Sequence, residues 1–165
     1  MKKIFICMIV TLTTLGCSNA QDKEFSKESL TKKLITPENT EISFQEIIKK
    51  HNGKITVIEV WASWCSDCVK AMPKVKQMQN DFPNVDFVFL SVDKAFDKWQ
   101  NGIQNNELTG DHYWIPDGMK GDFGQSIKLN WIPRYIVIDK TGKVAIYKAI
   151  ETDFEKMYKQ IKKLE

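Results

Sequence analysis

The sequence has little net charge, few histidines and no apolar run long enough to cross a membrane. Its 165 residues carry a net charge of +3, of which Lys2 and Lys3 contribute two. A chain so near neutrality gives no reason to expect nucleic acid as a partner. The one long apolar stretch, residues 4–15, is shorter than the roughly 20 residues of a transmembrane helix. We find no internal repeats, and a hydrophobic content of 42% predicts a single globular domain.

The first 16 residues have the pattern of an export signal. Lys2 and Lys3 precede the apolar stretch, as in bacterial signal peptides. The stretch ends at Thr14-Leu15-Gly16-Cys17, which resembles a lipobox and implies cleavage before Cys17 and lipidation of that residue. The alternative is cleavage after Ser18-Asn19-Ala20, which would release a soluble periplasmic protein. We expect a periplasm-facing protein of the cell envelope, anchored through Cys17 unless this second cleavage occurs.

Only four cysteines are present, and export would leave two of them as free thiols. Cys7 leaves with the signal, and Cys17 is either lipidated or removed. The remaining pair, Cys65 and Cys68, has two residues between its members. A disulfide that closes so short a loop stabilises a fold little, so this pair is better interpreted as a functional dithiol than as a structural bridge.

The polar residues 17–33 predict a flexible tether, followed by a folded domain over residues 34–165. Nearly continuous apolar runs at 55–62 and 85–92 predict two strands buried on both faces. Capping boxes at Ser43 and Thr152 and a cap at Asp93 predict helix starts, and residues 65–81 are helical in pattern, with Val69 on the apolar face. Residues 134–138 and 144–148 predict a hairpin. This order is typical of an α/β sandwich in which helices flank a mixed sheet.

The two cysteines lie where a predicted strand gives way to a predicted helix. The N–H groups and dipole at a helix start favour a thiolate, which is the attacking form of cysteine. Cys65 is therefore the expected nucleophile, and Cys68, one turn later, the expected resolving thiol. Asp67 opposes a thiolate, and Lys70 can offset it.

Glu59 is the one charged residue in the strand that leads to the cysteines. One interpretation is a solvated side chain at a sheet edge. The other is a buried carboxyl behind Cys68 with a raised pKa, which takes the proton of Cys68 as that thiol attacks. We favour the second, since Val57, Ile58, Val60 and Trp61 make the strand look central.

The segment Val60-Trp61-Ala62-Ser63-Trp64-Cys65-Ser66-Asp67-Cys68 resembles the active-site segment of the thioredoxin superfamily. Pro73 matches the proline inside the family's helix, Glu59 its buried aspartate, and Ile132-Pro133 its cis-proline loop. The resemblance covers residues 34–165 and implies a thioredoxin-like three-layer sandwich. It also implies that Ile132 and Pro133 face the sulfurs and that the adjoining backbone pairs with a substrate peptide. Trp64 and Trp131 flank these elements, and we expect them to form an apolar rim for that peptide.

The signal, the long segment before Pro133 and the run from Trp131 to Lys143 resemble the membrane-tethered TlpA/ResA-like branch, common among Bacteroides-group lipoproteins. The resemblance implies an extracytoplasmic thiol–disulfide oxidoreductase that exchanges its Cys65–Cys68 pair with disulfide- or dithiol-containing envelope proteins. We favour the direction of a reductase that is re-reduced by a membrane electron donor. We expect a monomer with no cofactor and no metal. Ser66-Asp67 replaces the family's frequent Gly-Pro or Glu-Pro, so the redox potential is left open.

Three other functions are compatible with a cysteine pair. A zinc site or a metal chaperone would need further ligands, and His51 and His112 lie in no paired ligand pattern. A peroxidase would need a Thr-x-x-Cys arrangement, which is missing. A binding module that uses the fold without redox turnover is the remaining alternative, and the presence of both cysteines disfavours it.

Overall fold

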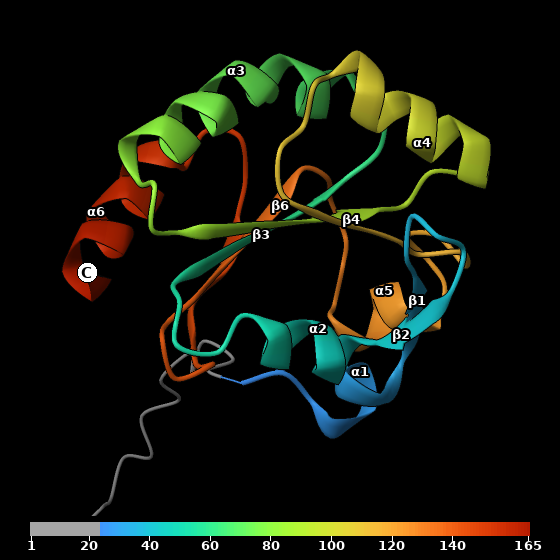
Figure 1. Ribbon diagram of the computed structural model, residues 1–165, viewed down its shortest axis with the longest axis horizontal. Coiled ribbons are helices and arrows are strands. Elements are labelled where there is room, and N and C mark those ends of the chain that lie inside the picture. Colours follow the sequence, from blue (N-terminus) through green and yellow to red (C-terminus); the bar gives the residue numbers. More distant parts are fainter. Residues whose placement is uncertain (1–23) are drawn as a thin grey trace, which may run out of the picture.

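A computed structural model describes residues 24–165 of the chain (Figure 1). The predicted signal, Cys17 and the first part of the predicted tether lie outside the described residues. Within residues 24–165, no helix combines the length and the apolar character that crossing a membrane requires.

A seven-stranded mixed sheet forms the centre of the domain, in the order β2-β1-β5-β4-β3-β6-β7. Parallel pairing joins β3 to β4 and β4 to β5, whereas β1 pairs antiparallel with β2 and β5, and β6 pairs antiparallel with β3 and β7. Every residue of β3 is buried, as its unbroken apolar sequence predicts. The strands are β1 (Lys33–Ile35), β2 (Glu41–Ser43), β3 (Thr56–Trp61), β4 (Asp86–Ser91), β5 (Asp111–Trp114), β6 (Arg134–Ile138) and β7 (Val144–Ala149).

Helices cover both faces of the sheet, which confirms the predicted three-layer sandwich (Figure 1). On one side lie α3 and α4, with α6 beside α3, and on the other lie α1, α2 and α5. Pro73 lies inside α3, as the family resemblance implies. The helices are α1 (Lys27–Thr31), α2 (Phe44–Lys50), α3 (Ser66–Asp81), α4 (Phe96–Asn105), α5 (Asp122–Ser126) and α6 (Phe154–Leu164).

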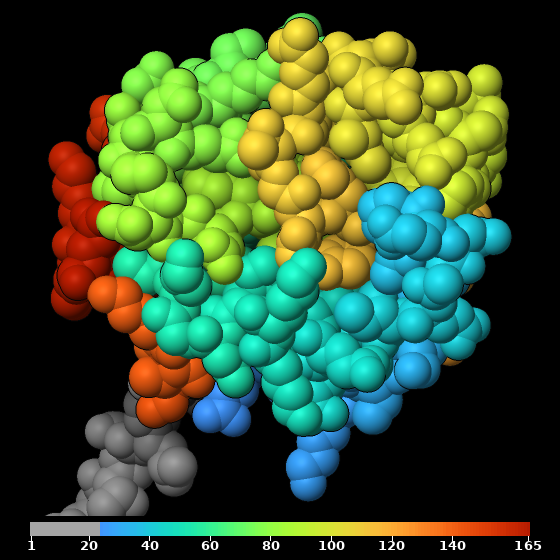
Figure 2. All heavy atoms as spheres, in the orientation of Figure 1, coloured from blue at the N-terminus to red at the C-terminus, as the bar shows by residue number. Residues whose placement is uncertain are grey.

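The folded part begins earlier than residue 34, where the sequence places it. Residues 27–31 form α1, in which Ser29 is fully buried. The ring of Phe25 packs edge-on against Phe44 with 4.7 Å between centroids and also contacts Tyr147. Figure 2 shows the segment from residue 24, in blue to cyan, lying against the teal region of α2. The predicted tether therefore does not include residues 24–33, because one aromatic side chain fastens this polar segment to the core.

Two of the three predicted helix caps are wrong. At Ser43 the capping box is present, since its hydroxyl accepts from the N–H of Glu46 and the Glu46 carboxylate accepts from the N–H of Ser43. No such box forms before α6: its N-cap is Asp153, whose carboxylate accepts from the N–H of Ile150 instead. Asp93 does not cap α4 either, because its carboxylate lies buried among other donors and the helix starts after Ala95.

Candidate active site

Cys65 and Cys68 form a disulfide where β3 gives way to α3, with their Cα atoms 5.2 Å apart. Cys65 is the N-cap of α3, and its sulfur accepts a hydrogen bond of 3.1 Å from the N–H of Cys68. The Cys65 side chain is 7% exposed, whereas Cys68 is fully buried. A helix start that donates to the sulfur stabilises a thiolate there. This geometry suits Cys65 to attack a partner and Cys68 to resolve the mixed disulfide.

The loop over residues 131–133 lies against the disulfide. Its Ile132 carbonyl oxygen is 3.8 Å from the Cys65 sulfur, and the peptide bond between Ile132 and Pro133 is cis. The sheet register explains the placement: Arg134, the first residue of β6, pairs with Val60 near the end of β3. Because β3 and β6 are antiparallel, the residues before Arg134 come to lie beside the turn that carries the cysteines.

Three apolar side chains around the site are partly exposed to solvent. Trp64 is 57% exposed, Trp131 50% and Val69 38%, and we call these three residues the apolar rim. Val69 was expected to face the core and does not. It lies one helical turn after Cys65, so it shares the face of α3 that carries the sulfur. Exposed aromatic groups beside a reactive sulfur are a surface on which another polypeptide can dock.

Glu59 is buried in the middle of the sheet, 2% exposed, between Phe89 on β4 and Tyr135 on β6. The interpretation of a solvated edge residue is therefore wrong. The Tyr135 hydroxyl donates a hydrogen bond to Oε1, whereas Oε2 has no partner within residues 24–165. Burial raises the pKa of Glu59 to about 8, and the Tyr135 hydrogen bond opposes that shift. A carboxyl with this pKa can exchange a proton with a thiol, whose ordinary pKa is about 8.5.

Glu59 and Trp61 point to the same face of the sheet, because alternate residues of a strand share a face. Trp61 meets α4 there, since a Cβ added at Gly102 would come within 3.1 Å of its ring. The ring of Tyr135, whose hydroxyl donates to the Glu59 carboxyl, packs on Phe154 of α6 with 5.4 Å between centroids. Glu59 therefore lies on the side of the sheet that α3, α4 and α6 cover.

The sequence did not single out Arg134 as part of the site. Its side chain is 2% exposed and no salt bridge joins it to any residue within 24–165. One guanidinium nitrogen donates to the side-chain oxygen of Asn130, and burial lowers the pKa of the group. Arg134 thus ties Asn130, the residue that precedes the loop over residues 131–133, to the start of β6. A charge directly after Pro133, at the start of an apolar run, is the signal that could have identified it.

The two histidines lie in different surroundings and not beside the cysteines. His51 contacts the carboxylates of Asp86 and Asp111 at 2.8 and 3.2 Å. His112 stacks on Phe89 with 5.0 Å between centroids, and burial lowers its pKa. Among residues 24–165, no group of three or more His, Cys, Asp or Glu side chains is arranged to hold a metal ion.

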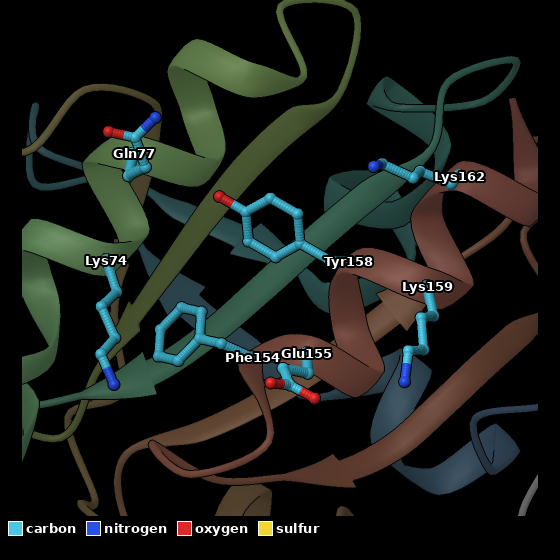
Figure 3. Close-up of a pocket in the computed structure, with 7 residues that line it drawn as sticks. All are labelled: Lys74, Gln77, Phe154, Glu155, Tyr158, Lys159 and Lys162. Carbon is cyan, nitrogen blue, oxygen red and sulfur yellow. The ribbon is translucent and has the colours of Figure 1, made fainter.

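A groove of about 470 Å³ lies between α3 and α6, away from the disulfide. Figure 3 shows the rings of Phe154 and Tyr158 pointing from α6 toward α3, with lysine side chains around them. Phe154 is also the ring that packs on Tyr135, so it separates this groove from the buried hydroxyl that holds Glu59. The groove residues are Lys74, Gln77, Phe154, Glu155, Tyr158, Lys159 and Lys162.

Comparison with known proteins identifies the family. A sequence model described as thioredoxin-like matches residues 52–144, more than half of the chain. The chain therefore belongs to the thioredoxin-like family. It is 36% identical to a thioredoxin of Geodia cydonium over 55 residues, which are 33% of this chain and 52% of that protein. The chain spans about half the length, or less, of the first curated relatives that it matches.

Solved structures share the fold over most of the chain. A protein described as a thiol-disulfide oxidoreductase of Bacteroides vulgatus superimposes with a TM-score of 0.65 and 24% identity, covering 92% of this chain and 93% of that one. A secreted Mycobacterium tuberculosis disulfide oxidoreductase, described as homologous to the DsbE of E. coli, gives a TM-score of 0.62 and 16% identity. That match covers 84% of this chain and all of the other. At these identities the likeness establishes the fold, and with the family match it confirms the predicted thioredoxin-like sandwich.

Proposed function

We propose that this protein is an extracytoplasmic thiol–disulfide oxidoreductase that reduces disulfides in other proteins with its Cys65–Cys68 pair. The observation that carries the proposal is the disulfide itself, placed at the start of α3 with its outer sulfur beside the Ile132 carbonyl. A structural bridge would need neither the helix start nor the exposed rim. Both belong to a site where one sulfur must ionise and meet a partner.

In the reduced protein, the Cys65 thiolate attacks one sulfur of a partner disulfide. A bond forms between Cys65 and the partner, and the second partner sulfur leaves as a thiolate. Glu59, in its ionised form, then takes the proton of Cys68, whose sulfur attacks Cys65. The mixed disulfide breaks, and the partner leaves with both of its cysteines reduced. Two electrons have passed to the partner, and the Cys65–Cys68 disulfide has formed.

The apolar rim and the loop over residues 131–133 form the proposed docking surface. The backbone beside Pro133 is the element with which a substrate peptide would pair, and Trp64 and Trp131 would cover its side chains. Partners of this kind are envelope proteins with accessible disulfides.

A further turnover requires a reductant, since each cycle leaves the protein oxidised. We propose a membrane electron donor for this step, with the chain tethered near it through lipidated Cys17. The signal pattern supports export, and the secreted Mycobacterium tuberculosis protein of the same fold supports a location outside the cytoplasm. Metabolic labelling with a clickable fatty acid tests the anchor, because Cys17→Ala should abolish the label while Cys7→Ala should not.

The activity is tested by reduction of insulin disulfides with dithiothreitol as the electron source. We expect the wild-type chain to accelerate the reaction and Cys65→Ser to abolish the acceleration. In cells, Cys68→Ser should accumulate mixed disulfides on Cys65, which identify the partners. If the wild-type chain does not reduce insulin and nothing is trapped, the protein is a binding module and the proposal is wrong.

A further inference from the structure

Asp93 is a buried carboxylate for which the proposed mechanism has no use. It follows β4, is 1% exposed, and forms no salt bridge with any residue from 24 to 165. Hydrogen bonds, and not a positively charged side chain, compensate the burial of the Asp93 carboxylate. Its oxygens accept from the Ser63 N–H at 3.0 and 3.2 Å, and from the hydroxyls of Ser63 and Ser91 at 2.7 Å each. A buried charge bound by this many donors fixes the position of whatever carries them.

Ser63 belongs to the turn that presents the nucleophile. The N–H of Cys65 donates to the carbonyl of Ala62 at 3.1 Å, which closes a turn with Ser63 and Trp64 at its centre. The Asp93 carboxylate therefore accepts hydrogen bonds from both the main-chain N–H and the side-chain hydroxyl of Ser63. Ser63 lies two residues before Cys65.

Helix α4 also restricts the position of the Ser63 side chain. A Cβ added at Gly102 of α4 would lie 2.7 Å from the Ser63 Cβ, so α4 packs directly on the turn. Asp93 is itself fastened from a third strand, because the Trp114 indole donates to its carbonyl oxygen at 2.7 Å. The turn is thus held between one helix and an anchored carboxylate.

We propose that Asp93 is a positioning residue for Cys65: through Ser63, it holds the turn over residues 62–65 so that the Cys65 sulfur meets the Cys68 N–H at the start of α3. The inference rests on the proposed function in one respect, the role of Cys65 as nucleophile. It adds the element that keeps the sulfur at the helix start. Without the anchor, the turn would open and the thiolate would lose part of its stabilisation.

Charge and position have opposite effects on Cys65, which makes the proposal testable. A negative charge near a thiol disfavours the thiolate, so removing Asp93 would lower the pKa of Cys65 if charge alone mattered. Positioning has the opposite sign, because loss of the anchor weakens the hydrogen bond to the sulfur. Ser63→Ala separates the two effects, since it removes one bond to the turn and leaves the Asp93 charge in place.

The experiment measures the rate of alkylation of Cys65 by iodoacetamide against pH. The full chain carries Cys7→Ser, Cys17→Ser and Cys68→Ala, so that Cys65 is the only thiol. Ser63→Ala should move the midpoint upward by about one pH unit and slow alkylation near pH 7 by about tenfold, because the hydrogen bond that the Cys68 N–H donates to the charged sulfur is weakened when the turn loosens. Asp93→Ala should move the midpoint in the same direction.

Ser91→Ala is the matched control, because its hydroxyl binds the same carboxylate at the same 2.7 Å but lies on β4 and not on the turn. It should lower the free energy of unfolding and leave the alkylation midpoint unchanged. If Asp93→Ala does not fold, Ser63→Ala decides alone. An unchanged midpoint in Ser63→Ala, or a downward shift in either variant, overturns the proposal. Insulin reduction by the wild-type chain is assayed separately, so failure of the proposed function would be recognised as such.

Discussion

The hydroxyl of Tyr135 donates a hydrogen bond of 3.3 Å to Oε1 of Glu59 in the interior of the domain. Oε2 is equally buried and has no partner in the part of the chain that the structure describes. The carboxyl therefore has one oxygen that is held and one that is free to take a proton. Its environment favours the protonated form at neutral pH, so the carboxyl must release that proton before it can accept the proton of Cys68, and a pKa of about 8, close to that of a thiol, permits both transfers.

Glu59 should make the stability of the domain depend on pH. Burial raises its pKa from an ordinary 4.5 to about 8 in the folded state. Between these values the unfolded chain has lost the proton while the folded chain keeps it. The free energy of unfolding should therefore fall by about 1.4 kcal/mol for each pH unit in that window, and no further above it.

Glu59→Gln removes this contribution, so the difference between the two proteins should grow from pH 5 to pH 8 in favour of the variant. Urea unfolding of the oxidised proteins at several pH values measures it. Parallel pH profiles for wild type and variant would contradict the buried, protonated carboxyl.

Tyr135→Phe should raise the pKa of Glu59 still further. The hydroxyl stabilises the charged carboxylate, and the substitution removes it with little change of shape. A hydrogen bond to a charged group contributes about 1.5–3 kcal/mol, which corresponds to a rise of roughly one to two pH units. The carbonyl stretch of the protonated carboxyl, followed by infrared spectroscopy against pH with Glu59→Gln as the blank, reports the midpoint. A midpoint that stays in place or falls would show that the hydroxyl does not hold the carboxylate.

Loss of the carboxyl should slow the second step of the exchange and spare the first. In Glu59→Gln, attack by Cys65 on a peptide disulfide should keep its wild-type rate, because Glu59 is assigned to the Cys68 proton. Resolution by Cys68 should slow by at least about tenfold near neutral pH, given that general base catalysis contributes roughly 10²–10⁴. Quenched-flow trapping of the mixed disulfide separates the steps. Equal slowing of both steps would point to a structural effect instead.

The apolar rim should contribute to partner binding and little to stability. Trp64→Ala and Trp131→Ala remove half-exposed side chains, so each should change the free energy of unfolding by about 0.5 kcal/mol or less. Each should raise the KM for a protein disulfide several-fold and leave the rate with a small disulfide unchanged. Tyr158→Ala is the comparison, since it removes an aromatic ring from the groove between α3 and α6 (Figure 3). A KM that rises equally in that variant would show that the rim has no special role.

The sequence predicted those strands of the fold in which nearly every residue is buried. The runs at 55–62 and 85–92 have no polar face, and they lie at the centre of the sheet as β3 and β4. Phe25 shows why the N-terminal boundary was wrong: a single aromatic in a polar segment gives no periodicity, and only the partners Phe44 and Tyr147 make it part of the core.

The candidate site was predictable where chemistry is local and not where it depends on distant segments. Cys65, Cys68 and the Ile132–Pro133 loop follow from short motifs. Asp93 was expected to cap a helix because caps are recognised from neighbours in sequence, but its carboxylate binds Ser63, thirty residues away. The sequence identifies Tyr135 only as a strand residue, because its hydroxyl reaches Glu59 only through the pairing of β6 with β3.

The central claim is that Cys65 attacks and Cys68 resolves. The most direct test is intact-mass analysis of Cys68→Ser and Cys65→Ser after brief reaction of each reduced protein with a peptide disulfide. The 7% exposure of Cys65, against the complete burial of Cys68, predicts a stable peptide adduct on Cys65 in Cys68→Ser, and no adduct on the same timescale in Cys65→Ser. A comparable adduct on Cys68, or no adduct on either protein, would contradict the account.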